Sequence, residues 1–268
     1  MLTRIITALL GIPLLVYVLY KGGVFITFVL TAVALVALWE FYNAFKKVDI
    51  LAFNVAGLLS SAVMTCAAGI YPEGAAGNLA AVLVACTMVC FVRMILQKKA
   101  RLNDLGITLL GLIYISVPMS MMLMLYHLDN GRVFIWLVFV LAWFGDTLAY
   151  FIGITMGKHK LCPAISPKKS IEGSAAGFAG SISGSVMFGY AAWRLFGIDY
   201  KVVNMLLVGF AGGILAQLGD LTASLIKRHA GVKDYGSIMP GHGGVLDRFD
   251  SVLFVIPMVY YYIRYFTG

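Results

Sequence analysis

Long apolar runs separated by short polar segments follow one another along almost the whole chain. Each run is apolar for about 20 residues, the length of helix that crosses the roughly 30 Å hydrocarbon core of a bilayer. The runs lack the in-and-out alternation of barrel strands. The sequence therefore predicts an all-α, polytopic integral membrane protein, a helical bundle with nine transmembrane helices. The predicted spans are 4–22, 23–45, 50–71, 75–96, 104–126, 132–155, 173–196, 202–226 and 250–267.

The composition and the distribution of charge agree with this prediction and orient the chain. Of the 268 residues, 61% are hydrophobic and 12% are charged, whereas soluble domains carry about 25% charged residues. No small-x-small cleavage site follows "GIPLLVYVLYKGG", which favours a first span over a cleaved signal peptide. In the nine-span arrangement, 15 Lys and Arg residues lie on the side of the N-terminus and 5 on the other. The positive-inside rule then places the N-terminus and the basic loops in the cytoplasm, and the C-terminus outside.

The two halves of the chain differ in where their polar residues stand. In residues 1–130 the polar residues lie mostly at helix ends and in turns. We interpret these N-terminal transmembrane helices as a packing scaffold, or alternatively as the surface of a homodimer. In residues 131–268 ionisable residues enter the spans themselves, where a charge at the helix centre costs at least about 2.5–3.5 kcal/mol. We therefore expect residues 131–268 to be the functional region, with two cytoplasmic basic loops.

A stripe of small residues marks the seventh predicted span. Its members recur at three- and four-residue intervals along one helical face: Gly173, Gly177, Gly180, Ser181 and Gly184. Small residues at this spacing allow two helix backbones to approach closely. The stripe predicts a closely packed helix near the centre of the bundle; lining a substrate groove is the alternative.

The sixth predicted span contains an aspartate in the stretch "WFGDTLAYFIG". Asp146, Tyr150 and Gly153 follow at i, i+4 and i+7 and therefore share one helical face. A functional carboxylate and a structural carboxylate that accepts a hydrogen bond from a neighbouring helix explain Asp146 equally well.

The loop "GKHKLCPAISPKKSIEG" is rich in lysine and leads into the glycine-striped helix. Pro167 bars a helix at the preceding residue, so "SPKKS" is predicted to be a turn. Ser170 is placed to cap the following helix, with Glu172 in its first turn. Lys168 and Lys169 stand beside this helix N-terminus, where free N–H groups favour a phosphate. A solvated basic loop explains the same residues without a ligand.

The third polar region ends the eighth span, in "AQLGDLTASLIKR", and continues through "HAGVKDYGSIMPGHGGVLDRFD". Asp220, Ser224 and Lys227 form a polar stripe, and Asp247 and Asp250 lie three residues apart where the ninth span begins. The glycines and proline exclude a continuous helix and let backbone amides approach a ligand. Carboxylates among cations suit Mg²⁺, which takes one or two carboxylates together with phosphate oxygens and water. This favours a phosphate–metal site over a network of structural ion pairs.

The stretch "SLIKRHAGVKDYGSIMPGHGGVLDRFD", Ser224 to Asp250, resembles the signature of the phosphatidate cytidylyltransferases, also called CDP-diacylglycerol synthases. It agrees at nearly every defined position over 27 residues. "SPKKSIEG" is similar to the SPKKTWEG of that family, and "DTLAYFIG" is similar to its preceding helix. Met239 replaces a usual isoleucine or leucine, Ser170 a threonine, and Ile171 a tryptophan. The missing tryptophan puts a base-stacking role at that position in doubt.

The resemblance implies that the chain transfers CMP from CTP to phosphatidic acid, which gives CDP-diacylglycerol and pyrophosphate and requires Mg²⁺. No protein nucleophile is needed, because an oxygen of the phosphatidate phosphate attacks the α-phosphorus. The implied partners are CTP, phosphatidic acid and the lipid bilayer, with a homodimer as a further expectation and no nucleic acid. The implied location is a bacterial inner membrane, with the active site facing the cytoplasm.

The same resemblance implies roles for individual residues. The implied metal ligands are Asp220 and Asp247, with Asp250 and Asp146 as supporting ligands or ligands of a second ion. The implied catalytic residues are Asp220, Asp247, Lys227, Arg248 and His242, the last as a phosphate donor or a proton carrier. The implied phosphate-binding residues are Lys168, Lys169, Ser166, Ser170, Ser224, Arg228 and Lys233.

Two other functions remain as alternatives. An ion-coupled secondary transporter also uses intramembrane carboxylates, but it typically has an inverted repeat and a site near the midplane. No such repeat is visible here, and the acids lie toward the cytoplasmic side. A CDP-alcohol phosphotransferase would carry the pattern DG-x2-AR-x8-G-x3-D-x3-D, which is absent from the sequence.

Overall fold

The computed structural model describes residues 13, 16–97, 100–238 and 243–266 of the chain. In this part the regular secondary structure is helical apart from one two-stranded sheet. It folds as two compact units, each built from two segments: Met1–Met124 with Lys227–Phe249, and Leu125–Ile226 with Asp250–Gly268. The predicted division at residue 130 concerned the roles of the two halves and stays a prediction.

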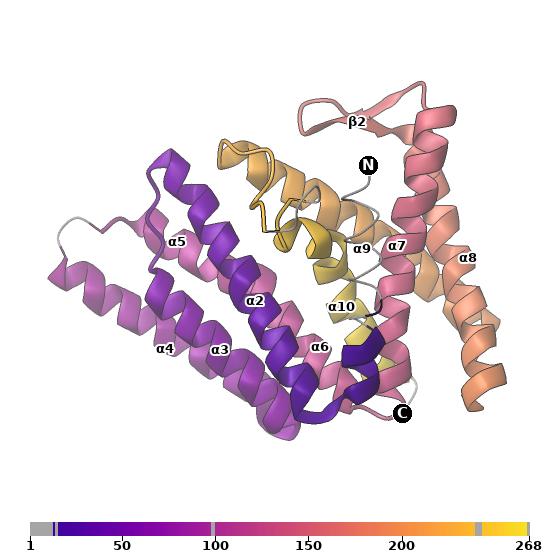
Figure 1. Cartoon of the computed structure of the whole chain (residues 1–268), viewed down its shortest axis with the longest axis horizontal. Helices are drawn as coiled ribbons and strands as arrows, with labels where there is room; N and C mark the ends of the chain where they lie inside the picture. The colour runs from indigo at the N-terminus through magenta and orange to yellow at the C-terminus, as the bar shows by residue number, and fades with distance from the viewer. Residues whose placement is uncertain (1–12, 14–15, 98–99, 239–242, 267–268) are drawn as a thin grey trace. The chain divides into compact units, whose positions relative to one another are not determined.

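The first unit is a group of apolar helices. In chain order these are α2 (Gly23–Phe45), α3 (Asn54–Ile70), α4 (Ala75–Leu96), α5 (Leu102–Gly111) and most of α6 (Val117–His127), with short 3₁₀ turns at Lys46–Val48 and Pro72–Gly74. α3 packs against both α2 and α4, as Figure 1 shows. The unit also contains residues 227–249, which join α9 (Val202–His229) to α10 (Leu246–Phe266).

A π-helical segment, Leu112–Ser116, joins α5 to α6 into one helical run from Leu102 to His127. Pro118 lies two residues after this segment, in the first turn of α6. Proline has no N–H to donate, and its ring clashes with the carbonyl four residues earlier. A wider turn at this point accommodates the proline without ending the helix.

Two buried polar anchors hold the first unit together. The hydroxyl of Tyr42, on α2, donates to the carbonyl oxygen of Thr108 at 2.8 Å. The carboxylate of Asp104 accepts from the N–H groups of Leu51 at 2.8 Å and Arg101 at 2.9 Å, and thereby caps α5. Both anchors tie segments that are distant in sequence into one packed unit.

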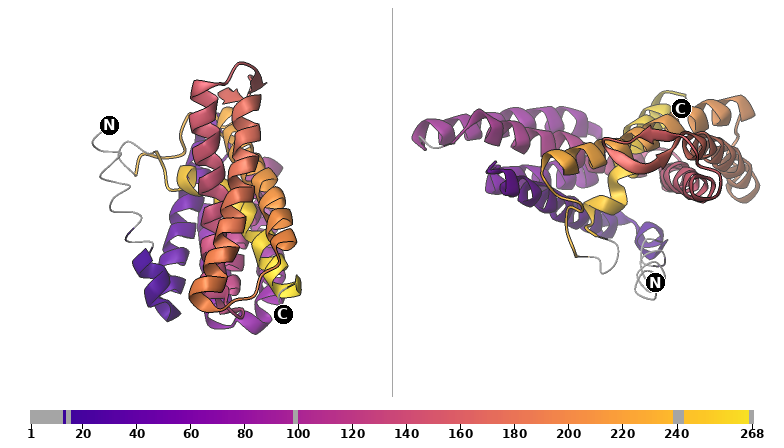
Figure 2. Two further views of the ribbon diagram at one scale, coloured as in Figure 1. Left: turned by 90° about the vertical axis from the view of Figure 1, so that its right-hand side faces the viewer. Right: turned by 90° about the horizontal axis from the view of Figure 1, so that it is seen from above.

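The second unit is built around three long helices. It contains α7 (Gly131–Thr155), a hairpin of β1 (Lys160–Cys162) and β2 (Ser166–Ser170), α8 (Ile171–Phe196), most of α9, and α10 from residue 250 onward. α7 and α8 run alongside each other over most of their length, joined at one end by the hairpin, as Figures 1 and 2 show.

The glycine stripe is the contact surface that permits this packing, as predicted. A Cβ added at Gly173 would lie 2.8 Å from the carbonyl oxygen of Ala149, and one at Gly180 would lie 2.7 Å from that of Phe144. On the facing helix α9, a Cβ at Gly209 would lie 2.6 Å from Cα of Ile182 on α8. α8 therefore packs closely against both α7 and α9 in this unit, with glycines at both contacts.

The predicted fold class is confirmed, since the chain is an all-α bundle with several membrane-length helices. In the described ranges five helical runs are long and apolar enough to cross a membrane: Gly23–Val48, Pro72–Leu96, Leu102–His127, Gly131–Thr155 and Val202–His229. α3 is a shorter apolar helix of 17 residues. The first predicted span, 4–22, lies largely outside the described residues, so the number of nine spans stays a prediction.

The structure corrects the prediction for "SPKKS" and several helix ends. "SPKKS" is not a turn but strand β2, which pairs antiparallel with β1 through Lys160 opposite Ser170 and Cys162 opposite Ser166. The residue before a proline favours extended backbone, and a two-stranded edge tolerates the missing N–H. α9 continues to His229, beyond the predicted end at 226, and α10 begins at Leu246, before 250. Both helices run past their apolar segments because polar residues at these ends are held by hydrogen bonds.

Candidate functional site

A cluster of acids around one lysine lies in the second unit. Nζ of Lys169, in β2, lies 2.5 Å from Oδ2 of Asp220, in α9. The Asp146 carboxylate, in α7, interacts electrostatically with both of these groups. Its Oδ2 accepts a hydrogen bond from the hydroxyl of Ser251, in α10, at 3.1 Å. We call these residues, together with Asp250, the Asp220 cluster.

α9 and α10 meet closely beside this cluster. A Cβ added at Gly219 would lie 2.6 Å from the carbonyl oxygen of Asp250. The side chain of Asp250 turns back on its own helix, where Oδ1 accepts from the N–H of Ser251 at 2.8 Å. The glycine beside Asp220 therefore allows α10 to bring Asp250 and Ser251 to the cluster.

The hairpin that carries Lys169 is held at both of its ends. Ser170 caps α8, as predicted: its hydroxyl oxygen accepts from the N–H of Gly173 at 3.1 Å. Glu172 accepts from the N–H of Lys158 at 3.1 Å, and its Oε1 lies 2.6 Å from Nδ1 of His159. The hydrogen bond with His159, aided by backbone N–H donors, lowers the pKa of Glu172 to about 2. Glu172 thus ties the start of the hairpin to the first turn of α8.

A second cluster, the Asp247 cluster, lies in the first unit. Asp247 is buried in the first turn of α10, and its Oδ1 accepts from Nζ of Lys227 at 2.7 Å. Its Oδ2 accepts from the N–H groups of Tyr235 at 2.9 Å and Gly244 at 3.0 Å. Nζ of Lys227 also lies 5.5 Å from the ring centroid of Tyr235, a cation–π distance. Asp247 therefore holds the last turn of α9, through Lys227, and two points of the segment that follows it, Tyr235 and Gly244.

The loop leaves α9 through a defined helix end. Gly231 has a φ of 66°, the left-handed conformation in which glycine commonly follows a helix. The N–H of Val232 donates to the carbonyl of Lys227 at 2.9 Å, and that of Gly231 donates to Arg228 at 3.2 Å. This pair of bonds is a Schellman motif, which turns the chain while Lys227 remains in the last turn of α9.

The chemistry of the Asp220 cluster fits a hard divalent cation. In the described ranges no group of three or more His, Cys, Asp or Glu side chains is arranged to hold a metal ion. Mg²⁺ does not need such a group, because it takes one or two carboxylates and completes its shell with phosphate oxygens and water. Asp146 and Asp220, with the hydroxyl of Ser251 beside them, offer this donor set.

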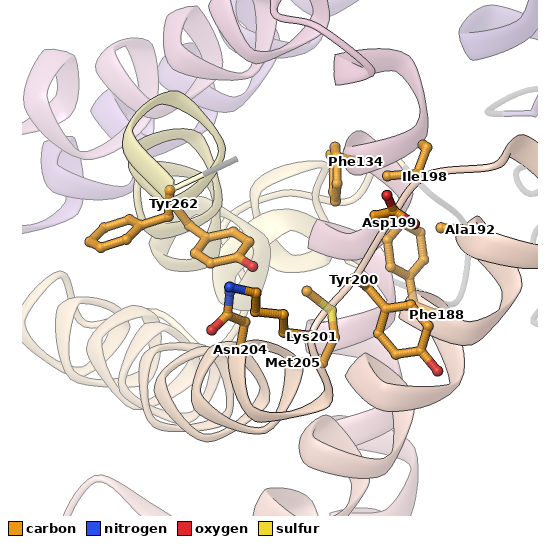
Figure 3. A pocket seen from close by; sticks show the side chains of 12 residues that line it. Phe134, Phe188, Ala192, Ile198, Asp199, Tyr200, Lys201, Asn204, Met205 and Tyr262 are labelled. Atoms are coloured by element: carbon orange, nitrogen blue, oxygen red, sulfur yellow. The ribbon is translucent and has the colours of Figure 1, made fainter. Parts of the chain in front are cut away.

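The second unit also contains a cavity of about 490 Å³, whose lining residues are shown in Figure 3. It lies at the start of α7 and α9 and at the ends of α8 and α10, between aromatic residues such as Phe134, Phe188 and Tyr262. None of the acids of the Asp220 cluster lines it. The charged residues of the Asp220 cluster therefore lie outside this cavity.

Comparison with known proteins identifies the family. The sequence profile of the cytidylyltransferase family matches residues 2–266. The chain belongs to the cytidylyltransferase family. The resemblance inferred from residues 224–250 is thereby confirmed over the whole chain.

Three similar members of the cytidylyltransferase family come from bacteria. A phosphatidate cytidylyltransferase of Staphylococcus epidermidis is 33% identical over 265 residues, which cover 97% of each chain. The protein of this name from Bacillus subtilis is 31% identical over 268 residues, covering 98% of each chain. One from Staphylococcus aureus is 33% identical over 267 residues, covering 97% of each. The similarity is thus spread over the full length of these relatives.

In this cytidylyltransferase the structure brings several of the predicted site residues together. Lys169, Asp146 and Asp220 meet in one cluster, and Lys227 and Asp247 meet in the other. The remaining phosphate-binding candidates are exposed or half-buried, apart from Ser170, which is buried as the helix cap: Ser166, Lys168, Ser224, Arg228, Lys233 and Arg248. His242 lies outside the described residues. The catalytic, binding and metal roles of all these residues stay predictions.

The sequence analysis missed Glu40, in the middle of the stretch "ALWEFYNAF". Glu40 lies in α2 and is 1% exposed, so a buried ionisable residue stands inside a span well before residue 131. Its carboxylate accepts from the N–H groups of Val245 and Leu246 at the start of α10. The sequence did contain a signal for Glu40, because a lone carboxylate in the apolar run 23–45 requires a polar partner.

Proposed function

We propose that this chain transfers CMP from CTP to phosphatidic acid and so forms CDP-diacylglycerol and pyrophosphate. One observation carries the proposal: the family match spans residues 2–266, and the full-length relatives are named phosphatidate cytidylyltransferases. The transporter alternative has no support from these relatives. In the reaction, a phosphatidate oxygen bonds to the α-phosphorus of CTP while the bond from that phosphorus to the β-phosphate bridge breaks. Pyrophosphate carries away the displaced electron pair.

The chain contributes to this reaction mainly by positioning and by neutralising charge, as in other phosphoryl transfers. Lys169 supports such a role, since its ammonium is paired with Asp220 yet remains partly exposed, with 24% of its side chain accessible. When an anionic phosphate arrives, Lys169 exchanges Asp220 for a phosphate oxygen. Lys168, from the same strand, is proposed to bind a further phosphate oxygen. In the first unit, Lys227 and Arg228, at the end of α9, stay proposed phosphate-binding residues.

The carboxylate that Lys169 releases is proposed to bind Mg²⁺. Asp220 and Asp146 are the proposed ligands, with Asp250 in support, and a second ion is included in the proposal. Mg²⁺ when bound neutralises the polyphosphate and stabilises the charge of the departing pyrophosphate. Asp247, in the first unit, can bind a metal ion only if Lys227 leaves its Oδ1, because both Asp247 oxygens have protein partners. Its predicted role as a ligand therefore requires an exchange like that of Lys169.

Labelled CTP tests the proposed reaction directly. The purified protein is incubated in mixed micelles with phosphatidic acid, Mg²⁺ and CTP labelled either at the α- or at the γ-phosphate. We expect the α-label in the extracted lipid and the γ-label in pyrophosphate. Diacylglycerol, which lacks the attacking phosphate, serves as the control acceptor and stays unlabelled. Transfer of the γ-label to lipid, or no labelled lipid at all, contradicts the proposal, and full turnover in excess chelator contradicts the metal requirement.

We also propose that the protein lies in a bacterial inner membrane with both basic loops in the cytoplasm. The bacterial relatives and the 15-to-5 distribution of Lys and Arg support this orientation. Single cysteines at the exposed positions Lys160 and Ser237 test it, in a background without the four native cysteines. An impermeant maleimide applied to intact spheroplasts is expected to label neither site. Cross-linking of the same preparations tests the proposed homodimer, which should give a species of twice the mass.

A further inference from the structure

Glu40 is a buried carboxylate that holds the start of another helix. The N–H of Val245 donates to its Oε1 at 3.1 Å, and the N–H of Leu246 donates to its Oε2 at 2.9 Å. Leu246 is the first residue of α10, where backbone donors have no partner within the helix. A carboxylate at a helix N-terminus also interacts favourably with the helix dipole. Glu40, about 200 residues earlier in the chain, therefore caps α10.

Two glycines of the signature stretch leave room for this carboxylate. A Cβ added at either Gly236 or Gly244 would lie 2.7 Å from Cδ of Glu40, and closer still to one of its carboxylate oxygens. Neither glycine has a positive φ, so an alanine would meet no backbone strain at either position. These glycines are therefore required by the space that Glu40 occupies and not by a left-handed backbone conformation.

Glu40 and Asp247 accept hydrogen bonds from three consecutive backbone N–H groups. Asp247 accepts from the N–H of Gly244, and Glu40 accepts from the next two N–H groups, of Val245 and Leu246. Asp247 also holds the ammonium of Lys227. Any shift of residues 244–246 therefore moves the Asp247 carboxylate and the lysine paired with it.

We propose that Glu40 is a positioning residue for the nucleotidyl transfer. Its carboxylate sets the position of Gly236 and of residues 244–246, and through them the orientation of Asp247 and Lys227 toward the substrates. The inference rests on the proposed function, but the anchor itself can be measured without turnover. Glu40 contacts no reacting atom in this scheme, and its effect on the rate passes through the loop that it holds.

The central experiment compares Glu40→Gln with a matched buried carboxylate, Asp104→Asn. Asp104 is likewise buried and accepts two backbone N–H groups in the same unit, but it anchors residues 51 and 101. Each amide keeps the size of the side chain and replaces one acceptor oxygen by a donor that faces an N–H. We expect both variants to lower the melting temperature, but only Glu40→Gln to lower kcat per folded protein, by about tenfold or more.

Equal kcat values per folded molecule for Glu40→Gln, Asp104→Asn and the parent protein would overturn the proposal. If Glu40→Gln does not fold, Glu40→Asp replaces it: the variant keeps both acceptor oxygens but is one methylene shorter. It is then expected to fold and to lose kcat, while the KM for CTP changes by less. A loss confined to the amount of folded protein contradicts the positioning role here as well.

A cycle with Gly244→Ala tests why the glycine is needed. Alone, Gly244→Ala should displace the carboxylate and reduce kcat about as much as Glu40→Gln. In a Glu40→Ala background the same alanine should add little, because the carboxylate it would displace is gone. Gly106→Ala is the control, since a Cβ there meets nothing within 4 Å. Independent, multiplicative losses from Gly244→Ala and Glu40→Ala would show that Gly244 does not serve Glu40.

Hydrogen exchange separates the inference from the proposed function. Exchange of the amides of Val245 and Leu246 is expected to be faster in Glu40→Gln than in the parent protein or in Asp104→Asn. If the parent protein has no transferase activity, the proposed function fails while this measurement still tests the anchor. If the parent is active but exchange is unchanged by Glu40→Gln, the anchor fails and the proposed function stands.

Discussion

Lys169 in the hairpin and Asp220 in α9 form an ion pair across 2.5 Å, which connects two motifs separated by 50 residues. The two side chains are neither fully buried nor fully exposed, with 24% and 32% of their surfaces accessible. A pair in this position can exchange partners when a polyanion and its counter-cation arrive.

Asp220→Asn keeps the size of the side chain and removes its charge. We expect kcat to fall by about 10²-fold or more, because groups that act on the charge of the transition state have effects of this size. The Mg²⁺ concentration needed for half-maximal rate should rise at the same time. Asp234→Asn, an exposed aspartate in the connecting loop, is the control and should lose much less. Near-normal turnover of Asp220→Asn at ordinary Mg²⁺ would exclude Asp220 as a metal ligand.

Lys169→Met and Lys168→Met compare neighbouring residues of one strand. Only Lys169 pairs with Asp220, whereas Lys168 is exposed. We expect Lys169→Met to lower kcat/KM for CTP more than tenfold and Lys168→Met to lower it only a few-fold. The steady-state rates of both variants are measured over a range of CTP concentrations, with the amount of folded protein determined separately. Equal losses would mean that the loop acts as a diffuse positive charge and that its specific pairing does not matter.

Gly180→Ala tests the close packing of α7 against α8. The added methyl would lie 2.7 Å from the carbonyl oxygen of Phe144, so the helices must separate. Overpacking of this kind costs about 1–3 kcal/mol, and we expect a clearly lower melting temperature in detergent. Gly106→Ala, at an open position, is the matched control and should leave the melting temperature unchanged or raise it. If both variants melt alike, the stripe does not determine the packing.

The stability contributed by Glu172 should depend on acid pH. Its pKa is about 2 in the folded protein, against an ordinary value of 4.5. Because the folded value is the lower one, the contribution is fully present above about pH 4.5 and is lost as the pH falls toward 2. Melting temperatures of the parent protein and of Glu172→Gln should therefore converge over this window. A difference that stays constant from pH 5 to pH 3 would contradict the assigned hydrogen bond with His159.

From the sequence alone, the helical class, most of the span limits and the family could be predicted. The predicted spans 23–45, 75–96 and 132–155 agree closely with α2, α4 and α7. The cap at Ser170 and the packing role of the glycine stripe were also predicted correctly. These features are local. Neighbouring positions in the sequence are enough to show continuous apolarity, a capping side chain and residue spacing along one helical face.

Only the tertiary structure decided which polar groups meet. The extended conformation of "SPKKS" depends on its pairing with β1, and the Lys169–Asp220 pair depends on the place where the hairpin lies. The reason for Gly236 and Gly244 lies in Glu40, a residue of α2 that no local pattern connects to them. A buried carboxylate must find donors somewhere in the fold, because its desolvation is otherwise uncompensated. The sequence shows that Glu40 needs a partner, but the path of the chain through space determines that the partner is the start of α10.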